Sequence, residues 1–246
     1  MKLLVCISKA PDTTSKVAFT DNNTRFNESG VQFIINPYDE WYALVRALEL
    51  KETLGGTVTI INVGKTDNEQ IIRKGLALGA DDAVRIDLDP ADAWQVAANI
   101  AAYAKAGAYD IILTGKETID YNGGVVGGMI AELLDLPYVA LAAKLDVDGN
   151  KLHIAQEMEG IKQMVTVAMP CVVSAQKGMA EARIPNMRGI LASKSKPVEV
   201  VQASVTDVKT PVKGFALPPE KTGCKLISAE QAAELVQLLH NEAKVI

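Results

Sequence analysis

Residues 111–134 read IILTGKETIDYNGGVVGGMIAELL: a short apolar run, a polar loop rich in glycine, and a second apolar run. This order predicts a strand that leads into a helix through a flexible loop. Glycine lets the backbone approach a ligand closely, and the free N–H groups at the start of a helix attract an anion. The loop has neither a Walker A ending nor the dinucleotide fingerprint. The spacing therefore leaves both a phosphate site and an ordinary strand-to-helix turn open.

Strands and helices alternate along the first half of the chain. Apolar runs predict strands at 3–7, 57–63 and 83–86, and helical patterns lie at 36–54, 68–79 and 89–107. In the first helix, Asn36 is expected as the N-cap and Pro37 as the first helical residue. The alternation predicts right-handed βαβ crossovers, and hence an α/β fold with a mostly parallel, Rossmann-like sheet and helices on both faces.

Beyond Pro137 the pattern changes. Residues 144–154 alternate around an Asp-Gly turn, as a hairpin does, and 161–168 and 171–175 are further strands. The sheet is therefore expected to gain antiparallel strands at one end. Residues 179–197 fit no buried element and form either a flexible loop or a partner-binding one. Methionine and isoleucine flanked by basic residues favour partner binding.

The C-terminal stretch has the composition of a linker followed by a helix. Prolines at 211, 218 and 219 precede SAEQ at 228–231, a capping-box pattern that starts an amphipathic helix. We therefore expect an α/β domain over residues 1–201, which contains the candidate phosphate site, and a C-terminal arm over residues 202–246 that docks on another surface.

Composition excludes several classes of function. The chain has 246 residues, 48% hydrophobic and 22% charged, with a net charge of −5 and 5% aromatic residues. A binder of nucleic acid or of an anionic membrane normally carries a basic surplus. Cys6, Cys171 and Cys224 are isolated, which argues against disulfides and a zinc site. No apolar run is long enough to cross a membrane and no signal peptide precedes the first strand, so a cytoplasmic protein is expected.

Catalytic groups are sparse. His153 lies in the hairpin and His240 in the terminal helix, so a metal pair or a Ser-His-Asp triad is not expected. No Gly-x-Ser-x-Gly elbow occurs. Cys6 on a central strand is expected to be a small buried residue, because a reactive thiolate needs a positive, accessible setting. We expect neither catalytic residues nor a metal.

Candidate ligand contacts follow the strands. In open α/β sheets, ligands lie outside the carboxyl ends of the strands. The segments in that position are 8–12, 63–65 and 115–128, with 36–39 nearby. Asp120 is expected either to accept a ribose hydroxyl or to shape the loop by bonding to backbone N–H groups. Lys116 is expected either to reach a phosphate or to lie at the surface.

Four stretches together resemble the β subunit of electron transfer flavoprotein. They are Asn36-Pro37, KGLALGAD at 74–81, GKETID at 115–120 with the glycine-rich helix start, and RIPNMRGI at 183–190. The resemblance spans essentially the whole chain in the expected order. It implies an electron carrier, a heterodimer with an α subunit whose FAD accepts electrons from flavoprotein dehydrogenases, such as the acyl-CoA dehydrogenases of fatty acid β-oxidation.

The resemblance also implies the ligand and the residues that hold it. The β subunit of that family binds AMP, or a second FAD in the electron-bifurcating members, and shares the other FAD with the α subunit. The corresponding cofactor-binding residues here are Cys6, Asn36, Pro37, Tyr38, Asp39, Val63, Gly115, Lys116, Glu117, Asp120, Tyr121, Asn122, Gly123, Gly124, Val125, Val126 and Gly127. Many members place Asn-Gln-Thr where this chain has Gly124-Val125-Val126, so backbone N–H groups must replace those side chains at the phosphate.

The family's partner-recognition loop corresponds to residues 183–192, and its hydrophobic anchor, commonly leucine, corresponds to Met187. The expected partner-binding residues are Arg183, Ile184, Pro185, Met187, Ile190 and Leu191. The alternative is a stand-alone adenine-nucleotide-binding protein on the same fold. The docking arm argues against this alternative.

Overall fold

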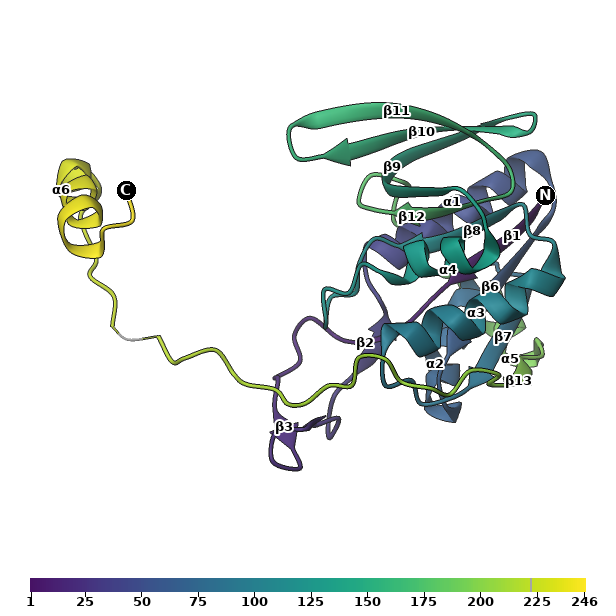
Figure 1. Ribbon diagram of the computed structural model, residues 1–246, viewed down its shortest axis with the longest axis horizontal. Helices are drawn as coiled ribbons and strands as arrows, with labels where there is room; N and C mark the ends of the chain where they lie inside the picture. The colour runs from purple at the N-terminus through teal and green to yellow at the C-terminus, as the bar shows by residue number, and fades with distance from the viewer. Residues whose placement is uncertain (222) are drawn as a thin grey trace. The chain divides into compact units, whose positions relative to one another are not determined.

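The computed structural model describes residues 1–221 and 223–246. These residues form two compact units, Met1–Gly214 and Phe215–Ile246. The larger unit is built around a nine-stranded sheet in the order β11-β10-β9-β12-β8-β1-β6-β7-β13 (Figure 1). Its strands are β1 (Lys2–Cys6), β6 (Thr57–Val63), β7 (Asp82–Asp87), β8 (Ile111–Gly115), β9 (Tyr138–Asp148), β10 (Lys151–Met158), β11 (Ile161–Ala168), β12 (Cys171–Ala175) and β13 (Glu199–Gln202).

Most neighbouring strands in this sheet are parallel. The pairs from β9 through β12, β8, β1, β6 and β7 to β13 are all parallel, and only β9–β10 and β10–β11 are antiparallel. The predicted α/β fold, with antiparallel strands at one end, is therefore confirmed. β13 was not expected from the sequence and extends the parallel part of the sheet beside β7.

Helices cover both faces of the parallel strands. They are α1 (Asp39–Leu54), α2 (Glu69–Leu78), α3 (Ala93–Gly107) and α4 (Val126–Leu134). Alternate residues of β1 point to opposite faces, as the period of a strand requires. Leu3 and Val5 pack in one core with α1 and α2, whereas Leu4 and Cys6 pack in the other with α3 and α4. Each face is thus sealed, and the polar loops are left at the strand ends.

Short strands form the excursion between β1 and α1. β2 (Lys9–Pro11) pairs with β5 (Phe33–Ile35), and β3 (Phe19–Thr20) pairs with β4 (Arg25–Phe26). The tip of this β3–β4 hairpin has positive φ angles at residues 21–23, an Asp-Asn-Asn sequence that tolerates the left-handed region. A short 3₁₀ turn, Thr66–Asn68, separates β6 from α2.

The start of α1 differs from the sequence prediction. The helix begins at Asp39, after Tyr38, which has a φ of 64° and provides no side-chain cap. Asn36 lies before this turn and is fully buried. Its side chain bonds to another loop, so its role is to brace that loop rather than to cap the helix. Local sequence rules assign caps correctly only when the side chain has no tertiary competitor.

Residues 179–197 also differ from the expected loop, because α5 (Met187–Ser195) lies within them. Asn186 caps this helix by accepting a hydrogen bond of 2.8 Å from the N–H of Gly189. Gly189 packs directly on α2, where a Cβ would lie 2.2 Å from the carbonyl oxygen of Ala77. The apolar pattern of the sequence does not indicate this helix, because its large apolar side chains face outward instead of forming a buried stripe.

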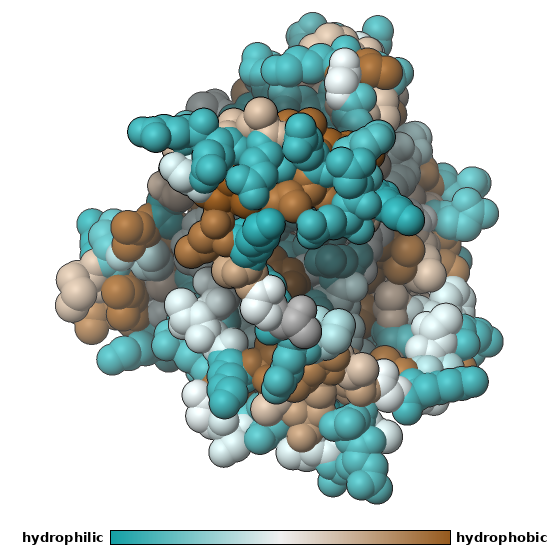
Figure 2. Space-filling view, turned by 90° about the vertical axis from the view of Figure 1, so that its left-hand side faces the viewer, coloured by the Kyte–Doolittle hydropathy of each residue, from teal (hydrophilic) through white to brown (hydrophobic). Residues whose placement is uncertain are grey.

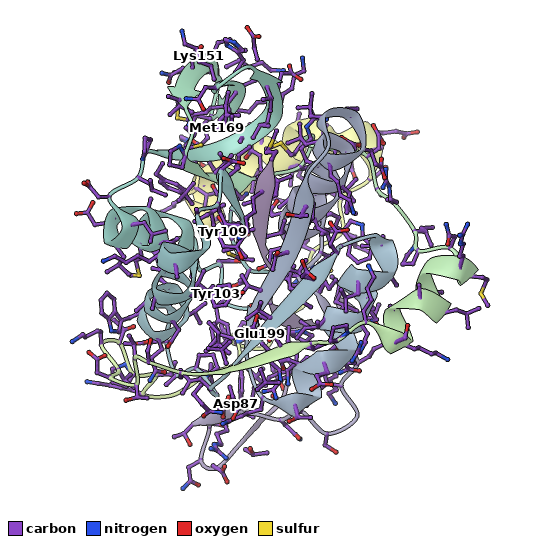
Figure 3. All side chains as sticks on the ribbon, turned by 90° about the vertical axis from the view of Figure 1, so that its right-hand side faces the viewer. Asp87, Tyr103, Tyr109, Lys151, Met169 and Glu199 are labelled. Carbon is purple, nitrogen blue, oxygen red and sulfur yellow. The ribbon has the colours of Figure 1, made fainter. Side chains whose placement is uncertain are left out.

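β13, the edge strand beside β7, is also joined to α3 by a side-chain contact. The Tyr103 hydroxyl of α3 donates to the Glu199 carboxylate at 3.3 Å, and Figure 3 shows these side chains beside the end strands. The chain then continues along α3 to Gly214. The compact unit therefore extends past Val201, where the sequence suggested its end. Whether the remaining tail docks on a partner stays a prediction.

The C-terminal unit contains a 3₁₀ turn (Ala229–Gln231), α6 (Ala232–Leu238) and a π-turn (Leu239–Ala243). Ser228 caps the 3₁₀ turn, as the sequence predicted, by accepting a hydrogen bond of 3.4 Å from the N–H of Glu230. Leu235 and Val236 of α6 are exposed. Hydrophobic side chains are visible among hydrophilic ones on the face of the molecule drawn in Figure 2. Among the described residues, no helix is both long and apolar enough to span a membrane.

Candidate functional site

A cavity of about 580 Å³ opens at the carboxyl ends of β1, β6 and β8. The loops after these strands form its floor and sides, as expected for an open α/β sheet. The residues before α3 and the later segment at Thr210 and Val212 complete the wall. The cavity is within the 300–1,000 Å³ range typical of small-molecule sites.

Two asparagine side chains in the cavity wall connect the loops around it. Asn62 Nδ2 donates to the Ile7 carbonyl at 2.9 Å, and Asn68 Nδ2 donates to Asn62 Oδ1 at 2.9 Å. Both asparagines are buried. Gly64 must lack a side chain, because a Cβ there would lie 1.9 Å from Asn68 Nδ2. These bonds fix the loops after β1 and β6 relative to each other.

Asn36 supports the glycine-rich loop after β8. Its Nδ2 donates to the Glu117 carbonyl at 2.9 Å, and its Oδ1 accepts from the Ile119 N–H at 3.0 Å. The loop is also closed internally by a 2.9 Å bond from the Asn122 N–H to the Thr118 carbonyl. A buried amide with both ends paired positions a loop firmly because an unpaired alternative would be costly. The sequence placed Asn36 near this site but not in this role.

A buried carboxyl group lies beside the loop after β1. Glu40 Oε2 accepts from the Ser8 N–H at 2.6 Å, and Glu40 Oε1 accepts from the Ser8 hydroxyl at 2.7 Å. Gly115 makes room for it, because a Cβ there would lie 2.8 Å from Glu40 Cγ. Burial raises the pKa of Glu40 to about 8; the Ser8 hydrogen bonds oppose the rise, and the carboxylates of Asp120 and Asp39 add to it.

The start of α4 has free hydrogen-bond donors beside the cavity. Val125 precedes the helix without a side-chain cap, and the first helical bond runs from the Met129 N–H to the Val125 carbonyl at 3.0 Å. The N–H groups of residues 126–128 thus have no intrahelical partner. Val126, Gly123 and Gly124 line the cavity at this point. Such a helix start carries a partial positive charge and binds anions.

Thr114, the next-to-last residue of β8, adds a hydroxyl group at the same place. It lines the cavity and is 3% exposed, and among the described residues its Oγ1 has no hydrogen-bond partner. A Cβ at Gly127 would lie 2.7 Å from this oxygen, so glycine allows the first turn of α4 to approach it. A buried hydroxyl without a partner is costly unless a ligand supplies one. The donor set fits a phosphate or another anionic group.

The charges around the cavity are mostly negative. Its carboxylates come from Glu28, Asp67, Asp89, Asp92, Glu117 and Asp120, and its lysines are Lys9 and Lys65. Glu40 also lines the cavity, but its raised pKa keeps its carboxyl group protonated at neutral pH. Lys9 pairs with Asp67 at 2.5 Å and with Glu28 at 3.4 Å. Lys65 pairs with Asp87 at 3.3 Å. Backbone donors and the α4 helix dipole, rather than free lysines, are therefore the groups that favour an anion here.

The structure brings about half of the sequence-predicted ligand residues to the cavity wall. Those that line it are Cys6, Val63, Gly115, Glu117, Asp120, Tyr121, Gly123, Gly124 and Val126. Those that do not line it are Asn36, Pro37, Tyr38, Asp39, Lys116, Asn122, Val125 and Gly127. Direct contact of either group with a ligand remains a prediction. Sequence reasoning missed Glu40, Thr114 and Thr210 as members of the site.

The open alternatives at Asp120 and Lys116 are partly resolved. Asp120 Oδ1 accepts from the Tyr121 N–H at 3.0 Å, so this side chain does shape the loop, and it also lines the cavity. Lys116 pairs with Glu117 at 2.8 Å. That bond raises the pKa of Lys116. Cys6 is buried, as expected, and its burial raises the pKa of its thiol.

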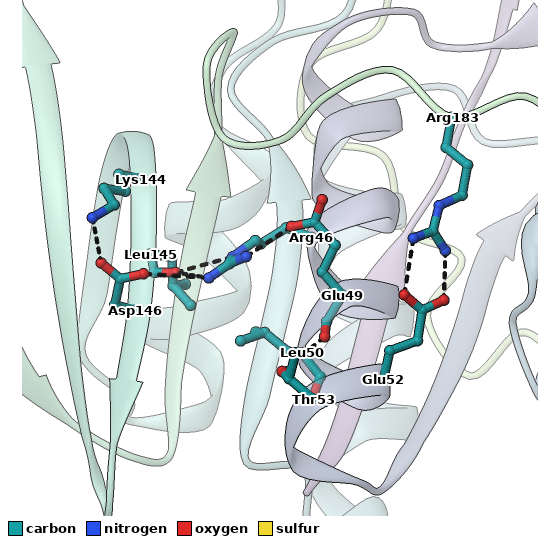
Figure 4. A network of polar contacts seen from close by, with 9 residues as sticks. All are labelled: Arg46, Glu49, Leu50, Glu52, Thr53, Lys144, Leu145, Asp146 and Arg183. Atoms are coloured by element: carbon teal, nitrogen blue, oxygen red, sulfur yellow. Dashed lines mark hydrogen bonds and ion pairs between the residues drawn. The ribbon is translucent and has the colours of Figure 1, made fainter.

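The predicted partner-binding segment lies elsewhere on the unit. Ile184, Met187, Ile190 and Leu191 are all exposed. Figure 4 shows the segment tied to α1, where the terminal nitrogens of Arg183 lie 2.7 and 2.9 Å from the carboxylate oxygens of Glu52. On the other side of α1, Arg46 donates to the Leu145 carbonyl of β9. Arg183 therefore supports the segment as well as contributing to its charge.

Comparison with known proteins supports the family resemblance that the sequence motifs indicate. Residues 24–206 match the electron transfer flavoprotein domain family. The chain is 37% identical to the electron transfer flavoprotein subunit beta of Bacillus subtilis, over 100% of both chains. It is 30% identical to the Homo sapiens subunit beta over 94% of both chains, and 28% identical to the Caffeyl-CoA reductase-Etf complex subunit CarD of Acetobacterium woodii over 99% of this chain and 98% of that one. The chain belongs to the electron transfer flavoprotein beta subunit family.

Proposed function

We propose that the cavity binds an adenine nucleotide, either AMP or the second FAD of an electron-bifurcating type, with a phosphate at the start of α4. The observation that carries this proposal is the buried Thr114 hydroxyl, which has no partner within residues 1–221 and 223–246, beside the free N–H groups of residues 126–128. A bound phosphate would pair these groups and offset the cost of burying them. The Gly124-Val125-Val126 sequence offers only backbone donors here.

The chain acts as one half of a heterodimeric electron carrier. Its similarity to beta subunits over their full length supports pairing with an α subunit. The FAD shared with that subunit would supply the redox chemistry. The residues of this chain would hold the nucleotide, exclude water from it and orient the docking surface.

Residues 183–192 dock the flavoprotein dehydrogenase that donates electrons, with acyl-CoA dehydrogenases as the representative donors. The exposed apolar side chains of this segment support the proposal, and α2 and the Arg183–Glu52 pair hold them in place. Apolar anchors on a rigid support are typical of binding hot spots. Arg183 and Lys194 beside them would steer the approach of an acidic partner.

Co-expression with an α-type subunit tests this function. A yellow one-to-one complex is expected, and denaturing release followed by mass spectrometry should give AMP or FAD beyond the shared FAD. A folded complex without nucleotide in the cavity would refute the ligand assignment. A chain that remains monomeric and colourless, yet retains a nucleotide, would support the stand-alone nucleotide-binding protein instead.

A further inference from the structure

Residues 203–212, here called the strap, run from β13 toward Gly214 without forming a helix or strand. They lie along α3, which holds them through side chains. Asn99 Oδ1 accepts from the N–H groups of Ser204 and Val205, at 2.8 and 3.0 Å, and Asn99 Nδ2 donates to the Val205 carbonyl at 2.7 Å. Gln95 Nε2 donates to the Thr206 carbonyl at 2.6 Å.

Asp92, the N-cap of α3, fastens the far end of the strap. Its Oδ1 accepts from the Gln95 N–H at 2.9 Å and so caps the helix. Its Oδ2 accepts from the N–H groups of Lys209 and Thr210, at 2.6 and 2.8 Å. The Asp92 carboxylate therefore caps α3 with Oδ1 and binds the strap with Oδ2. Burial opposes its charge, but these backbone hydrogen bonds outweigh burial and lower the pKa of Asp92.

The fastened end of the strap is also a wall of the cavity. Thr210 and Val212 line it together with residues 89–93. Beyond Val205 the strap has no buried side chain, and Val208 and Val212 are exposed. Hydrogen bonds rather than apolar packing therefore determine where this wall stands. A wall held in this way is less stable than the strands behind it.

We propose that Asp92 is a positioning residue that holds the strap as a closing wall of the nucleotide cavity, so that strap and nucleotide stabilise each other. This inference rests on the proposed adenine-nucleotide site. A ligand that touches Thr210 and Val212 gains contacts only when the strap is closed. Binding of the ligand therefore favours the closed strap. By thermodynamic linkage, closing of the strap strengthens ligand binding by the same factor.

The test uses the full-length chain, freed of nucleotide by charcoal treatment, with AMP as the probe. Asp92→Asn keeps an oxygen to cap α3 but cannot accept at both positions. Asn99→Ala loosens the strap from a residue that does not line the cavity. Asp110→Asn is the matched control, because Asp110 also accepts a backbone N–H, from Lys2 at 2.7 Å. Asp110 precedes β8 and so lies at the amino ends of the strands, whereas the cavity opens at their carboxyl ends.

Titration calorimetry gives the AMP affinity, and hydrogen exchange follows the amides of residues 203–212. In the wild type, AMP should slow hydrogen exchange in the strap about tenfold. Asp92→Asn and Asn99→Ala should each weaken AMP binding about tenfold. Asp110→Asn should leave AMP binding unchanged. Wild-type affinity in both strap variants, or strap exchange that AMP leaves unchanged, would overturn the inference while the nucleotide site stands. A wild type that binds neither AMP nor FAD would overturn the site itself, and the coupling with it.

Discussion

The cavity and the exposed face of α5 are built in opposite ways. At the cavity, buried polar side chains fix the surrounding loops, as in the Asn36 and Glu40 contacts, and the Thr114 hydroxyl is buried without a partner among the described residues. On α5 the large side chains are turned outward, and Met187 is 71% exposed. The backbone of α5 is nevertheless held firmly, because Gly189 packs against Ala77 of α2. One region is a concave polar site and the other a supported apolar surface.

The difference shows how one subunit can separate two tasks. A small charged ligand needs converging donors in a dry, fixed cavity. A protein partner needs exposed apolar anchors whose positions cost little entropy on binding. Because the two regions share no residues, damage to one should leave the other intact.

The largest effect is expected from shortening the chain. Ending it after Val201 removes the strap, so Asn99, Gln95 and Asp92 lose the hydrogen bonds that they make to it. At roughly 1–3 kcal/mol for each such group, the loss is several kcal/mol, or on the order of 10 °C in Tm. Ending it after Gly214 should change Tm by no more than about 2 °C. Calorimetry decides: equal Tm values for the two truncations would show that the strap is not part of the fold.

Gly127→Ala should damage the cavity. The new Cβ would lie 2.7 Å from Thr114 Oγ1, so it should destabilise the chain by about 1–3 kcal/mol and weaken AMP binding. Gly128→Ala is the control on the same helix turn, because its Cβ would make an ordinary 3.5 Å contact with the Tyr138 ring. It should be neutral or gain the roughly 1 kcal/mol of alanine helix propensity. If denaturant unfolding and AMP titration do not distinguish the two variants, close packing at Gly127 is unimportant.

The acid–base behaviour of Glu40 should appear in the stability of the whole chain. Its folded-state pKa of about 8 exceeds the ordinary value of 4.5, so the folded chain binds the extra proton between these values. Stability should therefore fall by on the order of a few kcal/mol as pH rises through this window. Glu40→Gln should flatten that part of the profile. Thermal melts from pH 5 to 9 measure it, and an unchanged slope in the variant would assign the pH dependence to other groups.

Met187→Ala should weaken donor docking by about 1–3 kcal/mol without changing nucleotide binding, because it removes an apolar anchor from the surface. Met164→Ala on β11 is the matched control, since Met164 is 70% exposed. The measurement is the rate of flavin reduction in the heterodimer as the donor dehydrogenase concentration is varied. An apparent donor affinity within about twofold of wild type for Met187→Ala would make α5 a passive surface.

The strand-end loops could be predicted from the sequence because their signals are local. Runs such as 57–63 and 171–175 match β6 and β12 residue for residue, and apolar periodicity alone determines them. The chain order then brings the following loops to one edge of the sheet. The position of the cavity therefore follows from patterns within short windows.

The remaining features depend on contacts between distant segments. Asp92 and Thr210 are 118 residues apart, and nothing near either residue indicates their bond. Asn36 looks like a helix cap because local rules cannot see the loop that it binds, 81 residues away. The α5 helix lacks a buried stripe and so lacks the usual periodic signal. Sequence reasoning indicated the strand ends where the cavity lies but could not assign these supporting roles.

In the proposed site, the Thr114 hydroxyl and the free N–H groups at the start of α4 bind a phosphate of the nucleotide. Thr114→Val keeps the side-chain shape and removes the oxygen that has no partner among the described residues. AMP titration of this variant should show about tenfold weaker binding, equivalent to roughly 1.4 kcal/mol, while the Tm of the ligand-free chain stays equal or rises because no buried hydroxyl is left unpaired. AMP affinity equal to wild type would contradict the claim.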